Sequence, residues 1–406
     1  MKTIFTTLFI FLICFSISSS EQVQKFSRIK IFVPDQSTLQ NIWHTGIDYE
    51  GVTGKIGGDM EFVVSEFELQ QLQAKNISYQ ILVDDLSKEY QHRINPIPPL
   101  VKSGGFHYGS MGGFYTFTEV VRQLDSMHLL YPTIISARES IGTTREGRAL
   151  WAVKISDHPN LDEFVEPQVL YTAIHHAREP EGMMSLMYYM WWLLENYGAN
   201  QQATYLVNNR QMYFIPVVNP DGYVYNQTTN PNGGGYWRKN RRNNGDGTFG
   251  VDPNRNYGPD YMWDSPNGGS STSTSSDTYR GDTPFSEPEN LAIDNFMRTH
   301  NVKTCLNYHT YGNYLIYPFG YLSSENGDSL IFRDITYVMT SFNNYTSGTD
   351  LQTVNYSTRG NSDDYMFGDT TKPRTWTMTP EVGTTGFWPS VAEIFPLAME
   401  NLEPNK

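Results

Sequence analysis

Cysteine is nearly absent from this chain. Only Cys14 and Cys305 occur among the 406 residues, and Cys14 falls in an apolar leader that we expect to be removed. Cys305 lies in the run 302–308, whose composition predicts a buried strand, so we expect no reactive role for it. The mature chain then has no internal disulfide and depends on a large buried core for its stability.

Positive charge is also scarce. The chain has 29 Lys and Arg residues against 43 Asp and Glu residues, a formal net charge of −14, and no basic run. Phosphate-rich partners are bound mainly by clustered Lys and Arg, so the sequence argues against nucleic acids and anionic membranes as partners. It also contains no internal repeat.

Long apolar runs are missing except at the start of the chain. Lys2, the apolar residues 4–17 and the small residues 18–20 are typical of a secretory signal peptide over residues 1–20. The alternative is an uncleaved membrane anchor, but the run is shorter than the ~20 residues that span a bilayer. We therefore expect a protein that is secreted or held in the lumen of the secretory or lysosomal system, without a membrane partner after cleavage. Sequons for N-glycosylation begin at Asn76, Asn226, Asn344 and Asn355.

The N-terminal part of the mature chain, residues 21–94, predicts a small α+β domain. Strand-like runs at 25–33, 61–64 and 79–83 alternate with two helical patterns, the second opened by a capping box of Ser65 and Glu68. Residues 95–107 are rich in Pro and Gly and predict an exposed linker. The domain boundary is placed there.

Residues 108–406 predict an α/β domain. Thr116 with Glu119, and Ser286 with Glu289, mark helix starts, and continuous apolar runs such as 211–218 and 302–308 predict buried strands. Strands buried on both faces and separated by helices indicate a mixed, mostly parallel central sheet with helices on both faces.

Metal-binding residue types occur at the ends of three predicted strands. His176 and Glu179 follow the strand 169–174, His309 ends the strand 302–308, and Glu381 follows the strand 375–379. Taken singly, Glu179 also fits a helix N-terminus, which favours negative charge, and His309 also fits a core histidine. Ligands collect at the carboxyl ends of strands in open α/β sheets, so these side chains are expected to converge, whereas His175 is expected to pack in the scaffold.

Six motifs in order extend this pattern over most of the chain. They are His176-Ala-Arg-Glu179 after a strand, Trp237-Arg238-Lys239, Val251-Asp-Pro-Asn-Arg-Asn256, a strand running into His309-Thr310-Tyr311, Tyr356 with Gly360-Asn-Ser-Asp-Asp364, and Thr379-Pro380-Glu381. In this order the chain resembles zinc metallocarboxypeptidases of the carboxypeptidase A/B type, particularly the disulfide-poor bacterial-style members. The N-terminal domain resembles the family's ferredoxin-like pro-segment.

The resemblance implies a zinc-dependent exopeptidase. His176, Glu179 and His309 would bind one Zn²⁺ and leave a position open for water. Glu381 would be the general base that takes a proton from this water and delivers it to the leaving amine. Arg238 would stabilise the developing oxyanion.

The same resemblance implies a binding site for the substrate's C-terminus. Asn254 and Arg255 would bind the terminal carboxylate, and Tyr356 would close over it. The residues that would line the subsites further along the peptide are Arg178, Tyr311 and Phe387.

The resemblance also implies that substrate preference would depend on Asp363. The resemblance puts Asp363 at the floor of the pocket for the terminal side chain, as in carboxypeptidase B-type enzymes, which favours C-terminal Lys or Arg. Bacterial-style relatives carry a similar Ser-Asp-Asp pattern with broader preference, and a one-residue slip in alignment would make Asp363 an exposed loop acid. A broad-specificity enzyme is therefore the alternative.

The resemblance also implies that the protein is a zymogen. Its N-terminal domain would cover the cleft until an activating protease cuts the linker. Its partners would be peptides and proteins with a free C-terminal carboxylate, and we expect a monomer. The rival functions are a catalytically dead peptide-binding homologue, a zinc amidase acting on cell-wall peptides, and an adhesion protein. The presence of Glu381, Arg238 and the Asn254-Arg255 pair disfavours a protein that only binds.

Overall fold

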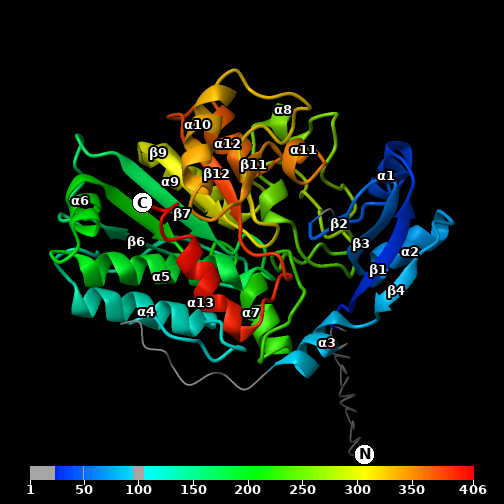
Figure 1. The fold of residues 1–406 in the computed structure, drawn as a ribbon, viewed down its shortest axis with the longest axis horizontal. Coiled ribbons are helices and arrows are strands. Elements are labelled where there is room, and N and C mark those ends of the chain that lie inside the picture. Colours follow the sequence, from blue (N-terminus) through cyan, green and yellow to red (C-terminus); the bar gives the residue numbers. More distant parts are fainter. Residues whose placement is uncertain (1–22, 49, 95–104) are drawn as a thin grey trace, which may run out of the picture.

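The computed structural model describes residues 23–48, 50–94 and 105–406 (Figure 1). The predicted signal peptide, residues 1–20, lies outside these ranges, as do residues 95–104 of the predicted linker. Strands within the described ranges form two sheets, a four-stranded sheet near the N-terminus and an eight-stranded sheet in the remainder.

The N-terminal sheet is antiparallel with strand order β2-β3-β1-β4. Two helices follow β1 and β3, which gives the predicted ferredoxin-like arrangement, and a third helix leads away from the sheet. Strand β2 was not predicted from the sequence, because two residues are too few to show the alternation of apolar and polar side chains that marks a strand. The elements are β1 Phe26–Val33, α1 Gln36–Trp43, β2 Thr53–Gly54, β3 Gly58–Ser65, α2 Glu66–Ala74, β4 Gln80–Val83 and α3 Leu86–Arg93.

The central sheet is mixed, with strand order β11-β10-β12-β9-β7-β8-β6-β5. Its middle strands β12, β9, β7 and β8 are parallel neighbours, and antiparallel pairs lie toward both edges. The strands are β5 Glu139–Thr143, β6 Ala149–Ile155, β7 Gln168–Ala173, β8 Gln211–Ile215, β9 Val302–Tyr308, β10 Tyr314–Ile316, β11 Thr346–Gly348 and β12 Trp376–Glu381.

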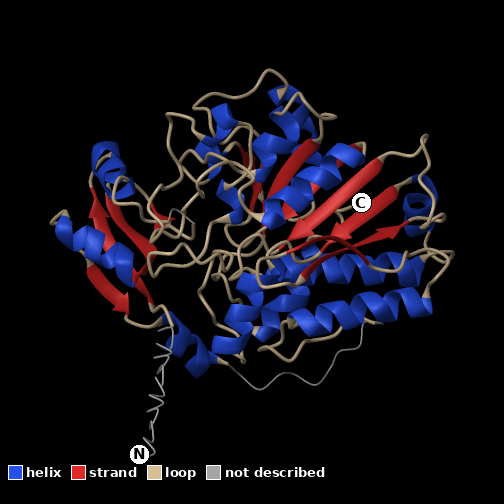
Figure 2. Ribbon diagram, turned by 180° about the vertical axis from the view of Figure 1, so that it is seen from behind, coloured by secondary structure: helices blue, strands red, loops and turns tan. Residues whose placement is uncertain are grey.

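Helices cover both faces of this sheet. Figure 1 shows α4, α5 and α13 along one face and α9, α10 and α12 on the other, and Figure 2 shows the same layers from behind. The elements are α4 Phe117–Leu130, α5 Pro180–Asn196, α6 Gln201–Asn209, α7 Pro220–Thr229, a 3-10 turn Pro253–Arg255, α8 Asp260–Trp263, α9 Pro288–Thr299, α10 Ser329–Thr340, α11 Asp350–Thr353, α12 Ser362–Gly368 and α13 Val391–Glu400. The predicted fold class is confirmed.

Side chains of the middle strands point alternately to the two faces of the sheet and form a hydrophobic core on each face. Leu170 of β7 packs into a cluster with Ile293 of α9, and the next residue, Tyr171, points to the opposite face and packs in a cluster with Met187 of α5. These strands are apolar on both faces, which explains the continuous apolar runs in the sequence. The buried, unpaired Cys305 lies in one of these strands, as expected.

One expectation is wrong in detail. Helix α9 begins at Pro288 with Glu287 as N-cap and no side-chain cap bond, so Ser286 doesn't cap it; the Ser286 hydroxyl donates to the Glu287 carboxylate instead. Proline is well suited to the first helical position and sets this start. Asn226 isn't available for a glycan in the folded chain, because its side chain is buried and donates to the carbonyls of Ala177 and Trp237.

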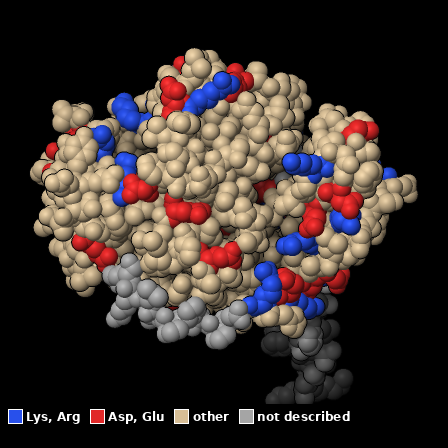
Figure 3. Space-filling model, in the orientation of Figure 1, with Lys and Arg blue, Asp and Glu red and all other residues tan. Residues whose placement is uncertain are grey.

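The N-terminal unit lies against the larger domain. Tyr90 of α3 packs on Trp388 with ring centroids 5.9 Å apart, and the Gln91 amide donates to the Gly233 carbonyl at 2.7 Å. Figure 3 shows the two lobes side by side, with acidic and basic side chains near the seam. In the part of the chain that the structure describes, no helix combines the length and the apolar character needed to cross a membrane.

The capping box of α4 gives a first test of the fold. The Thr116 hydroxyl accepts from the Glu119 amide, and the Glu119 carboxylate accepts from the Thr116 amide at 2.8 Å. We expect Thr116→Ala to lower the free energy of unfolding by about 1 kcal/mol, because an amide at the helix start loses its acceptor. Urea unfolding followed by circular dichroism measures this loss. The control is Thr118→Ala, an exposed position in the same turn; equal midpoints for the two variants would contradict the prediction.

Candidate metal centre and active site

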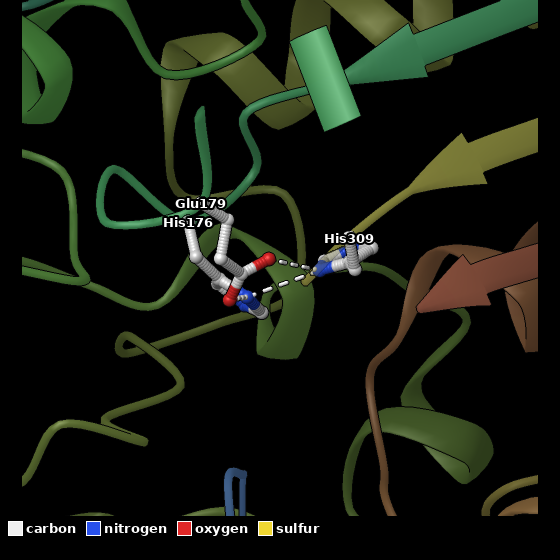
Figure 4. Close-up of side chains that lie close together, drawn as sticks. All are labelled: His176, Glu179 and His309. Atoms are coloured by element: carbon white, nitrogen blue, oxygen red, sulfur yellow. Dashed lines mark hydrogen bonds and ion pairs between the residues drawn. The ribbon is translucent and has the colours of Figure 1, made fainter. Parts of the chain in front are cut away.

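The carboxyl edge of the central sheet brings together His176, Glu179 and His309 (Figure 4). The Nδ1 atoms of the two histidines are 3.1 Å apart, Glu179 Oε1 is 2.7 Å from His176 Nδ1, and Glu179 Oε2 is 2.8 Å from His309 Nδ1. All three side chains are buried. The predicted convergence of these residues is therefore found in the structure.

Local backbone geometry aims these side chains. Ile174, the residue after β7, has φ +53°, which is strained for a β-branched residue and turns the chain sharply before His176. Helix α5 begins at Pro180, so Glu179 is its N-cap. His309 follows β9 and pairs with Glu381, the last residue of β12, in a parallel bridge. Parallel neighbours thus deliver all four residues to one edge.

The cluster fits a zinc ion. Two imidazole nitrogens only 3.1 Å apart need a shared proton or a metal between them, and a carboxylate completes the set. Zinc bonds of about 2.0–2.1 Å in tetrahedral geometry put neighbouring ligand atoms roughly 3.3 Å apart, close to the separations here. Three protein ligands leave one position open, which distinguishes a catalytic site from a structural one.

Asp252 contacts the Nε2 atom of His176, a role that the sequence motifs do not predict. Its Oδ1 is 3.2 Å from His176 Nε2, and its Oδ2 accepts two bonds from Arg238, at 3.0 and 2.7 Å. A proton on Nε2 leaves the Nδ1 lone pair facing the cluster, as a metal ligand requires. Burial raises the pKa of Asp252, but Arg238 and His176 outweigh it and hold that pKa well below its usual value.

One further arginine and one asparagine line the cleft. Asn254 is held by the Ser362 amide, which donates to its Oδ1 at 2.9 Å. Arg255 donates to the carbonyls of Gly269 and Asn254, both at 2.8 Å, and its Nη2 makes no hydrogen bond to any described residue. Gly360 allows this placement, because a Cβ there would lie 2.4 Å from the Arg255 carbonyl.

Glu381 is buried beside the metal cluster. Burial, reinforced by Glu179 and Glu50, raises its pKa well above the usual value for a carboxyl group. It lines the same cavity as Asn254 and Arg255. An acid in this position is suited to accept and return a proton.

The remaining predicted contact residues surround the cleft. Arg178 stacks over the Phe387 ring at 4.0 Å, and Phe387 meets Tyr311 edge-on with centroids 5.1 Å apart. Tyr356 is buried against Trp43 of the N-terminal unit at 6.2 Å. His175, expected to be scaffold, is 2.9 Å from the Tyr257 hydroxyl through its Nε2 and lies outside the cluster.

Asp363 is buried in the wall of a small cavity of about 30 Å³ next to the cluster. Its oxygens accept from Asn307 and Thr377, both at 2.8 Å, and from Thr379 at 2.7 Å. This excludes the alternative of an exposed loop acid. The cavity also contains Asn254, Arg255 and Tyr356.

Two carboxylates of the N-terminal unit enter the cleft, and no motif of the sequence predicts them. Asp48 bonds Arg178, and Glu50 bonds Arg238; Glu50 also lies 3.3 Å from His176 Nδ1 and 4.0 Å from Arg255 Nη2. Burial raises the pKa of Asp48, but the guanidinium groups of Arg238 and Arg178 lower it overall. No sequence motif marks these acids, because their partners lie more than a hundred residues away.

Comparisons with known proteins agree with this geometry. A family model described as zinc carboxypeptidase matches residues 120–404. Mast cell carboxypeptidase A of Homo sapiens is 29% identical over 351 residues, covering 84% of this chain and 75% of the relative. A zinc carboxypeptidase of Saccharothrix mutabilis subsp. capreolus is 30% identical over 363 residues, covering 85% of this chain and 79% of the relative.

Solved structures have the same fold. The carboxypeptidase A from Helicoverpa armigera superposes with a TM-score of 0.78 at 21% identity, covering 95% of this chain and 97% of that one. At this identity the likeness concerns the fold, and it includes the N-terminal unit because nearly the whole described chain is aligned.

The contact between Asp252 and His176 gives a second test. We expect Asp252→Asn to weaken zinc binding about 10- to 100-fold, because the neutral amide no longer fixes the charge and tautomer of His176. Competition with a chromogenic chelator measures the affinity, and circular dichroism checks the fold. The matched control is Asp260→Asn, an exposed acid eight residues away. Unchanged affinity in Asp252→Asn would show that Asp252 does not support the metal.

Proposed function

The chain belongs to the zinc carboxypeptidase family, and from that premise we propose a secreted zymogen whose activated form removes C-terminal residues from peptides, with a preference for Lys and Arg. The family makes it a metallocarboxypeptidase with zinc as cofactor. The observation that carries the proposal is the His176, Glu179 and His309 cluster lying beside buried arginine side chains in one cleft.

Proton transfer is assigned to Glu381. His176, Glu179 and His309 would hold the zinc, which would supply Lewis-acid chemistry for the scissile carbonyl and make the attacking water more acidic. Glu381 takes the proton of the attacking water and passes it to the leaving amine. Its burial beside the cluster, in the cavity that also contains Asn254 and Arg255, supports this role.

Charge stabilisation and substrate orientation are assigned to the cationic wall of the cleft. Arg238, oriented by Asp252, donates to the oxyanion as it develops, an interaction that is strongest in the transition state. Arg255 has an unused Nη2, and with Asn254 it binds the terminal carboxylate. Tyr356 closes over that carboxylate, and Arg178, Tyr311 and Phe387 bind residues further along the peptide.

Asp363 supports a preference for C-terminal Lys or Arg. A buried carboxylate in the cavity beside Arg255 favours a cationic side chain at the substrate's terminus. A broad-specificity carboxypeptidase is the second candidate, favoured by the three hydrogen bonds that already occupy Asp363. A catalytically dead homologue is disfavoured, since both Glu381 and Arg238 line the cleft.

The N-terminal unit is assigned the role of an inhibitory pro-segment over residues 21–94. Asp48 and Glu50 pair with Arg178 and Arg238, the groups that the substrate would meet. The Tyr311 hydroxyl, a proposed subsite group, donates to the Gly51 carbonyl at 2.9 Å. A protease that cuts within residues 95–107 would release the catalytic domain 108–406, which we propose to act as a monomer in a secreted or lumenal compartment.

Zinc and Glu381 are tested together on peptides ending in Lys, Arg, Phe or Leu. After limited proteolysis of the full chain, we expect the terminal residue to be released. A chelator should abolish this release, and Glu381→Gln should lower its rate at least a thousandfold because the general base is lost. Amino acid analysis measures the release. Activity that survives the chelator, or persists in Glu381→Gln, would refute this mechanism.

The inhibitory contact is tested in the intact chain. We expect Glu50→Gln to raise the activity of the uncleaved protein at least tenfold, because the neutral amide pairs poorly with Arg238. The control is Glu66→Gln, an exposed acid on the same unit, and proteolysed samples of each variant give the ceiling. If intact Glu50→Gln stays as inactive as the intact wild type, Glu50 is not the blocking group.

A further inference from the structure

We propose that Asp350 is a second acidic determinant of substrate specificity, which shares with Asp363 the recognition of a cationic C-terminal side chain. This inference rests on the proposed function, because it concerns the pocket of the same cleft. Asp350, which belongs to none of the sequence motifs, would contact the cationic end of the substrate's terminal side chain.

Asp350 lines the cavity that contains Asp363. The two acids come from different elements, Asp350 from the first position of α11 and Asp363 from α12. The apolar residues Ile316 and Val354 also line this cavity. The cavity is thus a partly apolar space with carboxylates supplied from two directions, as expected for a pocket that takes the long stem and charged end of Lys or Arg.

The hydrogen bonds of the two acids differ. Both oxygens of Asp363 already accept protons, from Asn307, Thr377 and Thr379. Asp350 Oδ2 accepts from the Thr358 hydroxyl, and its Oδ1 makes no hydrogen bond within residues 23–48, 50–94 and 105–406. Asp350 therefore retains more capacity to accept protons from a ligand than Asp363 does.

The backbone around Asp350 is built to hold this side chain in place. Thr349 and Gln352 form a capping box at the start of α11, and the amides of Val354 and Asn355 both donate to the Asp350 carbonyl. Gly320 leaves room beside the carboxylate, since a Cβ there would lie 2.1 Å from Asp350 Oδ2 and 2.2 Å from Thr358 Oγ1. A fixed carboxylate loses little conformational entropy when a ligand binds.

Neither acid has a cationic partner of its own. No Lys, Arg or His side chain of the described chain forms an ion pair with Asp350 or Asp363 within 4.0 Å. The nearest strong cation in the cavity wall is Arg255, which the proposed mechanism reserves for the terminal carboxylate. A buried carboxylate without a partner is costly, so a guanidinium or ammonium group that enters the cavity gains two counter-charges at once.

The pH dependence of selectivity follows from the same geometry. Burial raises the pKa of Asp350, and the neighbouring carboxylate of Asp363 raises it further. The hydrogen bond from Thr358 lowers this pKa, and the net result is a pKa of about 7. Below this pH the group is neutral and above it is charged, so preference for Arg over Leu rises as pH increases through 7. The charged and titratable groups that line the cavity around Asp350 are Asp363, Arg255, Glu50, Tyr356 and Glu381.

The test compares Asp350→Asn with the wild type as full chains after limited proteolysis. Asparagine keeps the volume and the acceptor for Thr358, and thermal unfolding checks that the fold is kept. The substrates are benzoylglycyl dipeptides ending in Arg, Lys and Leu, assayed from pH 6 to 8. The matched control is Asp334→Asn, an exposed acid on α10.

We expect Asp350→Asn to lower kcat/KM for Arg and Lys about 10- to 100-fold, the loss of one charge-assisted contact, with Leu changed less than threefold. The rise of the Arg-to-Leu ratio with pH should flatten in this variant, whereas a purely structural role would lower all three substrates together. Asp334→Asn should match the wild type.

Three outcomes would overturn the inference, and they differ in what they say of the proposed function. If the wild type prefers Arg and Lys but the ratio is unchanged in Asp350→Asn, only the role of Asp350 fails. If the wild type prefers Leu, the basic preference and this inference fail while the carboxypeptidase activity stands. If no substrate is hydrolysed, calorimetric binding of benzoylglycyl-arginine and benzoylglycyl-leucine to the proteolysed chains still decides: equal affinities for Asp350→Asn and the wild type refute the inference.

Discussion

Three guanidinium groups buried in one cleft are the constraint around which this molecule is organised. Arg178, Arg238 and Arg255 are all almost fully buried at the carboxyl edge of the central sheet. A buried charge must have a counter-charge, or it costs several kcal/mol. Asp252 is a permanent partner of Arg238 and also fixes His176, so charge balance and metal-ligand geometry depend on the same carboxylate. The other counter-charges come from Asp48 and Glu50, residues of a separate unit.

The cavity beside the cluster contains charges of both signs. Glu381, Asp350 and Asp363 line it from β12, α11 and α12, together with Arg255 and with Glu50 of the N-terminal unit. A cationic group and several carboxylates are therefore present within a single cavity. In the proposed enzyme a C-terminal Lys or Arg residue has the matching arrangement, with a negative carboxylate and a positive side chain on the same residue. One substrate residue would then satisfy both sets of buried charges.

The sequence predicted the parts of this structure that depend on local pattern. The strand 302–308 is continuous and apolar because it is buried on both faces, and residues at strand ends such as His309 meet because parallel strands share an edge. Asp252 was missed because it lies in a loop and contacts His176 across 76 positions of sequence. Glu50 was missed for the same reason, because its partner Arg238 lies 188 positions away in the sequence. Asp350 was missed because only the folded chain places it in the same cavity as Asp363. Proline decided the start of α9 where a capping pattern suggested Ser286.

The contacts of Glu50 and Tyr311 join two units that belong to one polypeptide. Covalent connection keeps the N-terminal unit near the cleft at an effective local concentration on the order of millimolar, whatever the amount of protein in solution. A single cut between residues 94 and 105 leaves every contact in place but makes the association bimolecular. The state of the cut molecule then depends on protein concentration. The N-terminal unit dissociates where the protein is dilute and stays bound where it is concentrated. Proteolysis in a concentrated store would therefore not by itself open the cleft, and dilution on release would complete the opening.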